Sequence, residues 1–199
     1  GAPAGLSWAG LTAPSDPLLD ALTLPGSLGV ISGSLDDDGL LPDALEQAIV
    51  ACRAQGKRVK FLYTIPNFNN PTGITQPVER RKEILAVAQE LSLLIVEDNP
   101  YGLLTIEGEP LPALRSMDPG VIYLGSFSKT FAPGFRIGWV LAPHAVRQLI
   151  PAGIKGGKHP VRMCAPYFQG SPKIVVVQLD KVFQAVRVIV EYFPVDIIV

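Results

Sequence analysis

Short apolar runs alternate with helical segments along the middle of this chain, and this alternation limits the folds open to it. The apolar runs cover residues 60–65, 92–97, 121–124 and 136–141. Apolar residues at helical spacing predict one helix from Pro42 to Ala54 and a second from about Thr75, its expected N-cap, to Leu91. Strands that alternate with helices favour an α/β domain with a mostly parallel sheet. Ligands bind such sheets beyond the carboxyl ends of the strands.

One lysine follows the third apolar run in a setting that suits a phosphate-bearing ligand. Lys129 lies just after two hydroxyl residues, Ser126 and Ser128, and seven residues before Arg136. A lone lysine in a serine-rich turn is more often a solvated surface residue. Between hydroxyls and an arginine, however, its amine would lie beside a bound phosphate, as a protein needs to hold pyridoxal phosphate as a Schiff base.

Four segments in a fixed order carry a family resemblance. They are Tyr63 to Gly73, which ends in Asn-Pro-Thr-Gly, then Glu97 to Tyr101, Ser126 to Lys129, and Gly134 to Arg136. Together they resemble the class I and II aminotransferases of fold type I, which use pyridoxal 5'-phosphate. The resemblance is nearest to the branch that holds 2-aminoadipate and kynurenine aminotransferases and the aminotransferase-like domains of MocR-type regulators.

The resemblance implies a role for each site residue. Lys129 would form the Schiff base and move the proton during catalysis. Asp98 would pair with the pyridine nitrogen and keep it protonated, which makes the ring an electron sink. Asn70 and Tyr101 would hydrogen-bond the ring's 3' oxygen, and Tyr101 is counted with Lys129 and Asp98 as catalytic.

The cofactor phosphate would be held by a second group of residues. The resemblance assigns it to Ser126 and Ser128, with Arg136 as the charge-assisted partner. No residues are assigned to a metal. Each residue also has a simpler reading, because Asp98 can cap a helix and Asn-Pro-Thr-Gly is a common turn sequence.

The implied fold is the three-layer, mostly parallel α/β sheet of the fold type I large domain, in incomplete form. The resemblance covers 34–143, whereas 1–33 reads as an irregular segment of unclear origin and 144–199 departs from the family pattern. In that last segment a strand is predicted over 173–178 and a helix over 179–192. The family's upstream phosphate loop and its arginine for the substrate carboxylate are not recognisable. We therefore expect a partial copy, from a truncated or frameshifted gene or a gene fragment.

Composition argues against several classes of partner. A formal net charge of −1 gives no electrostatic case for nucleic acid or an anionic membrane. No apolar run approaches the ~20 residues of a membrane span, and no signal peptide is evident. Cys52 and Cys164 lack metal or redox spacing and predict thiols in a reducing compartment. A cytoplasmic location is the expectation.

The expected function is the transfer of an amino group from an amino acid to a 2-oxo acid by a ping-pong mechanism. The resemblance also implies a role in amino-acid metabolism and biosynthesis, and assembly as a homodimer. Two alternatives stay open. One is the sensor domain of a MocR-type transcriptional regulator, although 1–33 is too short and too poor in Lys and Arg to supply its DNA-binding domain. The other is an inactive aminotransferase fragment. Other reactions of the same cofactor, such as β-elimination or decarboxylation, and the identity of the amino acid also stay open.

Overall fold

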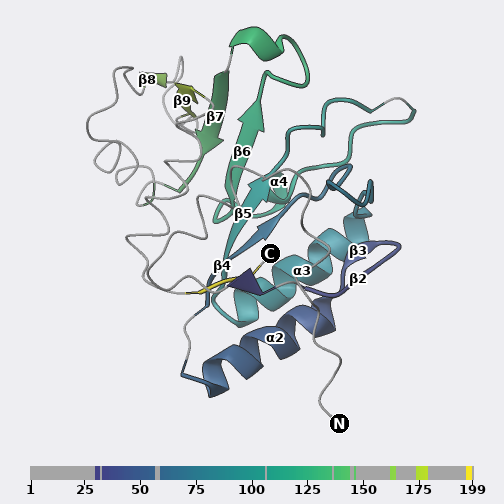
Figure 1. Cartoon of the computed structure of the whole chain (residues 1–199), viewed down its shortest axis with the longest axis vertical. Coiled ribbons are helices and arrows are strands. Elements are labelled where there is room, and N and C mark those ends of the chain that lie inside the picture. Colours follow the sequence, from purple (N-terminus) through teal and green to yellow (C-terminus); the bar gives the residue numbers. More distant parts are fainter. Residues whose placement is uncertain are drawn as a thin grey trace.

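The structure is a computed structural model of the 199-residue chain. It describes residues 30–31, 33–56, 59–105, 107–135, 137–143, 146, 162–164, 174–178 and 196–198. Within these residues it places one large mixed sheet, a short hairpin and three α-helices (Figure 1).

The large sheet has eight strands in the order β1-β10-β4-β5-β6-β7-β9-β8. The first five strands in this order run parallel to one another, and the last three are joined by antiparallel pairing. The strands are β1 (Val30–Ile31), β10 (Asp196–Ile198), β4 (Val59–Thr64), β5 (Leu94–Asp98), β6 (Ile122–Ser126), β7 (Ile137–Leu141), β9 (Ile174–Gln178) and β8 (Arg162–Cys164).

Helices cover one face of this sheet. Helices α2 (Pro42–Ala54) and α3 (Val78–Glu90) lie next to one another on the same side (Figure 1), and the four-residue α4 (Leu114–Met117) joins the same core. A 3-10 turn, Pro133–Phe135, follows β6. The buried cluster on this face includes Leu45 and Ile49 of α2, Ile84 of α3, Leu62 of β4 and Ile95 of β5. This cluster is the main source of hydrophobic stabilisation in the described domain core.

The α/β architecture predicted from the alternation is confirmed, and most element positions agree. Helix α2 begins and ends where predicted, since a proline at its first turn and a regular apolar stripe mark it clearly. The strand predicted over 173–178 is present as β9. The helix predicted over 179–192 lies outside the described residues, and the four-residue α4 was not predicted.

The start of the second helix was predicted wrongly. Helix α3 has Pro77 as its N-cap residue, not Thr75. The reason is that the Thr75 hydroxyl accepts a hydrogen bond from the backbone N–H of Phe68, 2.9 Å away, and so stabilises the preceding loop.

Among the described residues, no helix is both long and apolar enough to cross a bilayer.

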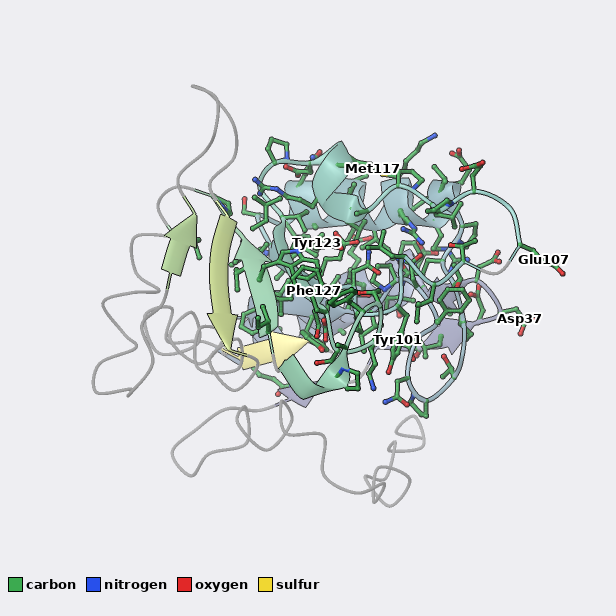
Figure 2. The ribbon with its side chains drawn as sticks, turned by 90° about the horizontal axis from the view of Figure 1, so that it is seen from above. Asp37, Tyr101, Glu107, Met117, Tyr123 and Phe127 are labelled. Atoms are coloured by element: carbon green, nitrogen blue, oxygen red, sulfur yellow. The ribbon has the colours of Figure 1, made fainter. Side chains whose placement is uncertain are left out.

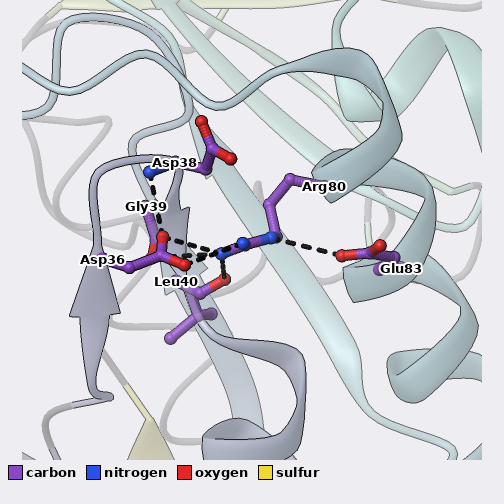
Figure 3. A network of polar contacts seen from close by, with 6 residues as sticks. All are labelled: Asp36, Asp38, Gly39, Leu40, Arg80 and Glu83. Carbon is purple, nitrogen blue, oxygen red and sulfur yellow. Dashed lines mark hydrogen bonds and ion pairs between the residues drawn. The ribbon is translucent and has the colours of Figure 1, made fainter.

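An arginine on α3 ties the small hairpin to the domain (Figure 3). The hairpin pairs β2 (Leu35–Asp36) with β3 (Gly39–Leu40). The guanidinium of Arg80 donates to both carboxylate oxygens of Asp36, at 3.0 and 2.9 Å, and to the carbonyl of Leu40 at 3.0 Å. Its Nε lies 3.2 Å from a carboxylate oxygen of Glu83. This two-pronged geometry is specific to arginine.

We predict that the contribution of Asp36 to stability depends on pH. Hydrogen bonding from Arg80 lowers the pKa of Asp36 below its ordinary 3.8, so its stabilising effect is present above that value and is lost as pH falls through the lower, folded pKa. Asp36→Asn should therefore lower the melting temperature at about pH 7, and the difference from wild type should shrink at about pH 3. Thermal denaturation at both values tests this, with Asp37→Asn as the matched control. An equal loss at both values would contradict the ion-pair interpretation.

Candidate functional site

Three parallel strands bring the predicted site residues to one edge of the sheet. β4 pairs with β5, and β5 pairs with β6, all parallel, so their carboxyl ends lie side by side. The ends of these strands and the segments that follow them carry Asn70, then Asp98 to Tyr101, then Ser126 to Lys129. The loop after β6 projects beyond the strand ends, at the top of Figure 1. This is the edge at which ligands bind in such sheets.

Asp98 ends β5 and points to the sheet face opposite the helices. Its register partner on β6 is Leu124, and Val96 two residues earlier pairs with Tyr63 of β4. Side chains alternate along a strand, so Tyr63, Val96 and Asp98 share this face. The Tyr63 hydroxyl donates a 2.5 Å hydrogen bond to the Oδ2 atom of Asp98, which is partly buried.

Lys129 and Tyr101 come together from two different loops. The Nζ atom of Lys129 lies 5.8 Å from the centroid of the Tyr101 ring, within the range of a cation–π contact. Tyr101 and Phe127 are labelled in Figure 2, and they mark the loops after β5 and β6. The Lys129 side chain is exposed and Tyr101 is half-buried, so the lysine amine is reachable from solvent.

The turn before Lys129 presents a hydroxyl that fits an anion. The backbone N–H of Ser128 donates to Ser126 Oγ at 3.0 Å, and the hydroxyl of Thr130 donates to the Ser126 carbonyl at 3.3 Å. These bonds fold the chain back on itself. The Ser128 Oγ atom is buried and has no hydrogen-bond partner within the described part of the chain. A buried hydroxyl without a partner is costly unless a ligand completes it. Its place beside a lysine fits a phosphate group.

Aromatic packing holds this turn against the sheet. Phe127 packs on Trp139 of β7 with ring centroids 4.8 Å apart, and on Phe131 at 6.4 Å. Trp139 lies opposite Gly125 in the antiparallel pair β6–β7, and any Cβ at Gly125 would overlap the indole ring. Glycine is therefore required there, because the indole occupies the space that a side chain would fill.

One predicted site residue, Asn70, is not joined to this group in the described part of the chain, and a second lies outside it. Asn70 lies exposed in the loop after β4, in a turn closed by a 2.5 Å bond from the Gly73 N–H to the Asn69 carbonyl. Within the described residues, no hydrogen bond joins the Asn70 side chain to Asp98, Tyr101 or Lys129. Arg136 lies outside the described residues.

A buried arginine holds the loops of this edge, and sequence reasoning missed it. Arg81 of α3 is fully buried. Its guanidinium donates to the Gln76 carbonyl at 2.9 Å and to Asn67 Oδ1 at 2.6 Å. It also donates to the carbonyls of Pro66, at 3.2 Å, and Pro112, at 2.9 Å. One side chain thus links the loop after β4 to the segment before α4.

Glu97 supplies a buried negative charge near Arg81, on the face of the sheet that the helices cover. Its two carboxylate oxygens accept the backbone N–H groups of Leu114 and Arg115, at 3.1 and 2.9 Å, where α4 begins. Burial raises the pKa of Glu97, while these two hydrogen bonds and the charge of Arg81 act in the opposite direction. Burial likewise lowers the pKa of Arg81, and the charge of Glu97 counteracts it. The two charges partly offset each other's cost of burial.

Asn99 links the segment after β5 to the loop after β4. Asn67 donates a 2.8 Å hydrogen bond to Asn99 Oδ1. Burial raises the pKa of Tyr123 on β6, and the side chain of Asn99 counteracts that rise. A Cβ at Gly102 would overlap the Asn99 side chain, so a glycine lets the chain pass over it.

Sequence patterns contain a signal for some of these missed residues. Arg81 falls at the helical phase of Ile84, Leu85 and Ala88, on the buried stripe of α3, where a charged residue is unusual. Tyr63 comes two residues after Phe61 in a predicted strand, so the two side chains are expected on the same face of the sheet. Asn67 and Asn99 lie in irregular segments, and no pattern marks them.

The described residues hold no group of three or more His, Cys, Asp or Glu side chains that could bind a metal ion. What they offer is a lysine amine, a carboxylate, a phenol and a buried hydroxyl around one sheet edge. This set of groups suits an organic cofactor that carries an aldehyde, a basic ring nitrogen and a phosphate.

Comparison with known proteins identifies the family. Residues 30–156 match the family model of aminotransferase class I and II, so the chain belongs to this family. It is 50% identical over 118 residues to the aromatic-amino-acid aminotransferase 1 of Thermococcus litoralis, which covers 58% of this chain and 28% of that protein. The crystal structure of the multiple substrate aminotransferase from Thermococcus profundus superposes with a TM-score of 0.55 and 53% identity, over 59% of this chain and 30% of that one.

A regulator is also among the relatives. An uncharacterised HTH-type transcriptional regulator of Bacillus subtilis is 40% identical over 114 residues, which are 56% of this chain and 22% of the regulator. The chain thus spans less than a third of the length of each of these three proteins. The resemblance drawn from four short motifs, and the fold type I large domain it implied, are confirmed.

We predict that removing the buried guanidinium destabilises the domain strongly. Arg81→Leu leaves three backbone carbonyls, Asn67 and the charge of Glu97 without their partner, and loss of one member of a buried pair costs about 3–5 kcal/mol. Urea unfolding followed by circular dichroism measures the change.

The matched control is Arg53→Leu, which removes one exposed bond to the Leu91 carbonyl, 2.6 Å long. This control should lose about 1 kcal/mol or less. A loss of that size in both variants would refute the central role of Arg81.

Proposed function

We propose that this chain is the pyridoxal-phosphate-binding core of an aminotransferase, which moves an amino group from an amino acid to a 2-oxo acid. The observation that carries the proposal is the meeting of Lys129 and Tyr101, from different loops, at the strand edge that Asp98 and the Ser126–Ser128 turn also occupy. Family membership supports the reaction class. Because the chain spans so little of its relatives, the activity of a whole enzyme remains part of the proposal.

Each residue has a defined task in the proposed site. When bound, the cofactor supplies an aldehyde for covalent attachment and a protonated ring that withdraws electrons. Lys129 provides the amine that attaches it and afterwards a base that moves a proton at the substrate's α-carbon. Asp98 holds the proton on the ring nitrogen, and the Tyr101 hydroxyl donates to the 3' oxygen.

The phosphate would be held by the turn after β6. Ser128 Oγ supplies the buried hydroxyl whose hydrogen bond is otherwise unmade in the described residues. Ser126 shapes the turn by accepting the Ser128 N–H. Asn70 and Arg136 complete the proposed set, at the 3' oxygen and the phosphate respectively. We assign residues 34–143 to the cofactor core, and 1–33 and 144–199 to segments outside it.

Three further features belong to the same proposal. They are assembly as a homodimer, a cytoplasmic location and a part in amino-acid biosynthesis. The thiol content and the absence of a basic or strongly acidic balance support the location, and the family supports the assembly and the metabolic role. Amino acids and 2-oxo acids are the proposed partners.

A second candidate is a cofactor-dependent sensor domain. The specific observation in its favour is the 40% identity to an HTH-type regulator over 114 residues. A sensor would bind pyridoxal phosphate without releasing a 2-oxo acid. Incubation of the loaded chain with a panel of amino acids, with mass spectrometric detection of 2-oxo acids, separates the two functions.

We predict that Lys129 is the attachment lysine. The chain should develop a visible absorption band with pyridoxal phosphate, and borohydride reduction should place a phosphopyridoxyl group on Lys129, found by peptide mass spectrometry. Lys129→Ala should lose both signals because no other proposed site residue carries an amine.

The control for this experiment is Lys82→Ala, which removes an exposed lysine of α3 that pairs with Glu79. It should keep the band and the label. Label scattered over surface lysines in wild type, or a band retained by Lys129→Ala, would overturn the assignment.

A further inference from the structure

A tyrosine outside the proposed set is bonded to the carboxylate of Asp98. The Tyr63 hydroxyl donates to Asp98 Oδ2 over 2.5 Å, which lies in the range of hydrogen bonds from a hydroxyl to an ionised oxygen. Tyr63 is 6% exposed, and its position in the middle of the sheet fixes its ring. The bond therefore links a rigid strand side chain to the carboxylate at the strand end.

We infer that Tyr63 is a positioning residue, which fixes the orientation of the Asp98 carboxylate and keeps it ionised to receive a protonated ring nitrogen. A hydrogen bond to the charged form of an acid favours that form. It also favours one plane for the carboxylate, because the last torsion of an aspartate side chain has only a broad preference of its own. The inference rests on the proposed function, because it supposes that Asp98 meets the cofactor ring.

The neighbouring acid favours such a donor at Asp98. Glu97 precedes Asp98 on β5, and the two carboxyl groups interact electrostatically. Glu97 brings a second acid close by, and like charges favour protonation of one of the pair. The Tyr63 hydroxyl opposes this effect by stabilising the charged carboxylate. Tyr63 thus acts through Asp98 and needs no contact with the substrate.

The first test uses the cofactor-free chain. Carbon-13 NMR of labelled aspartate, with the Asp98 signal identified from Asp98→Asn, follows the titration of this carboxylate directly. Tyr63→Phe removes only the hydroxyl, and the titration of Asp98 should move to higher pH. The matched control is Tyr123→Phe, which removes the hydroxyl of a tyrosine on β6 that is paired with Glu97, and it should leave the titration close to wild type.

A second substitution keeps the test decisive if Tyr63→Phe fails to fold. Difluorotyrosine at position 63 keeps the hydroxyl and makes it a stronger donor, so the Asp98 titration should move to lower pH. An unchanged titration in the folded variants would overturn the contact itself.

The second test adds pyridoxal phosphate labelled with nitrogen-15 in the ring. Tyr63→Phe should bind it about tenfold more weakly, a loss equivalent to about one hydrogen bond. Its ring-nitrogen chemical shift should also move toward that of the unprotonated ring, which a purely structural tyrosine would not cause. A changed Asp98 titration with unchanged affinity and nitrogen shift would overturn the positioning role. Failure of the wild-type chain to bind would overturn the proposed function and this role with it, while the carbon-13 titration decides the contact separately.

Discussion

The buried guanidinium of Arg81 is the interaction on which the candidate site depends. It donates to two loops and to the start of its own helix, and Glu97 balances its charge from the neighbouring strand. Loops that carry functional groups usually have few fixed contacts of their own. Here a single side chain satisfies carbonyls from both loops, because arginine alone presents five donors in a rigid plane. The cost is a charge in the core, which the domain tolerates because all three guanidinium nitrogens of Arg81 donate hydrogen bonds and Glu97 lies nearby.

Three consecutive residues at the end of β5 point alternately to the two faces of the sheet and make different contacts there. Glu97 and Asn99 serve the helix-covered face, where they hold α4 and the neighbouring loops. Asp98 points to the other face and meets Tyr63. The residues that hold the loops and the proposed cofactor-binding acid are therefore adjacent in sequence but lie on opposite faces of the sheet. In the proposed site, this arrangement keeps Glu97 away from the cofactor while Asp98 faces it.

Sequence patterns predict the elements of this fold well and its polar contacts poorly. Helix α2 was found with both ends, since its proline and apolar stripe depend only on neighbours in the chain. The start of α3 was missed because the Thr75 hydroxyl accepts a hydrogen bond from the backbone N–H of Phe68 in the preceding loop, and so does not cap the helix. Arg81 was missed because its acceptors include Pro66 and Pro112, 15 and 31 residues away. The placing of Asn70, Asp98, Ser126 and Lys129 at or just after the ends of strands was predictable, whereas the Tyr63–Asp98 bond requires the strand register.

The alternation along β5 has a consequence for how this segment can evolve. Its apolar positions accept exchange among Val, Ile and Leu at modest cost, because volume and polarity change little. A deletion or insertion of a single residue is different, since it rotates every later side chain to the opposite face. Glu97 would then face the ligand edge, and Asp98 would be buried against α4 beside Arg81. The length of this strand is therefore under stronger constraint than its composition, and divergence among active copies of this domain is expected as substitutions within β5 and as length changes only beyond it.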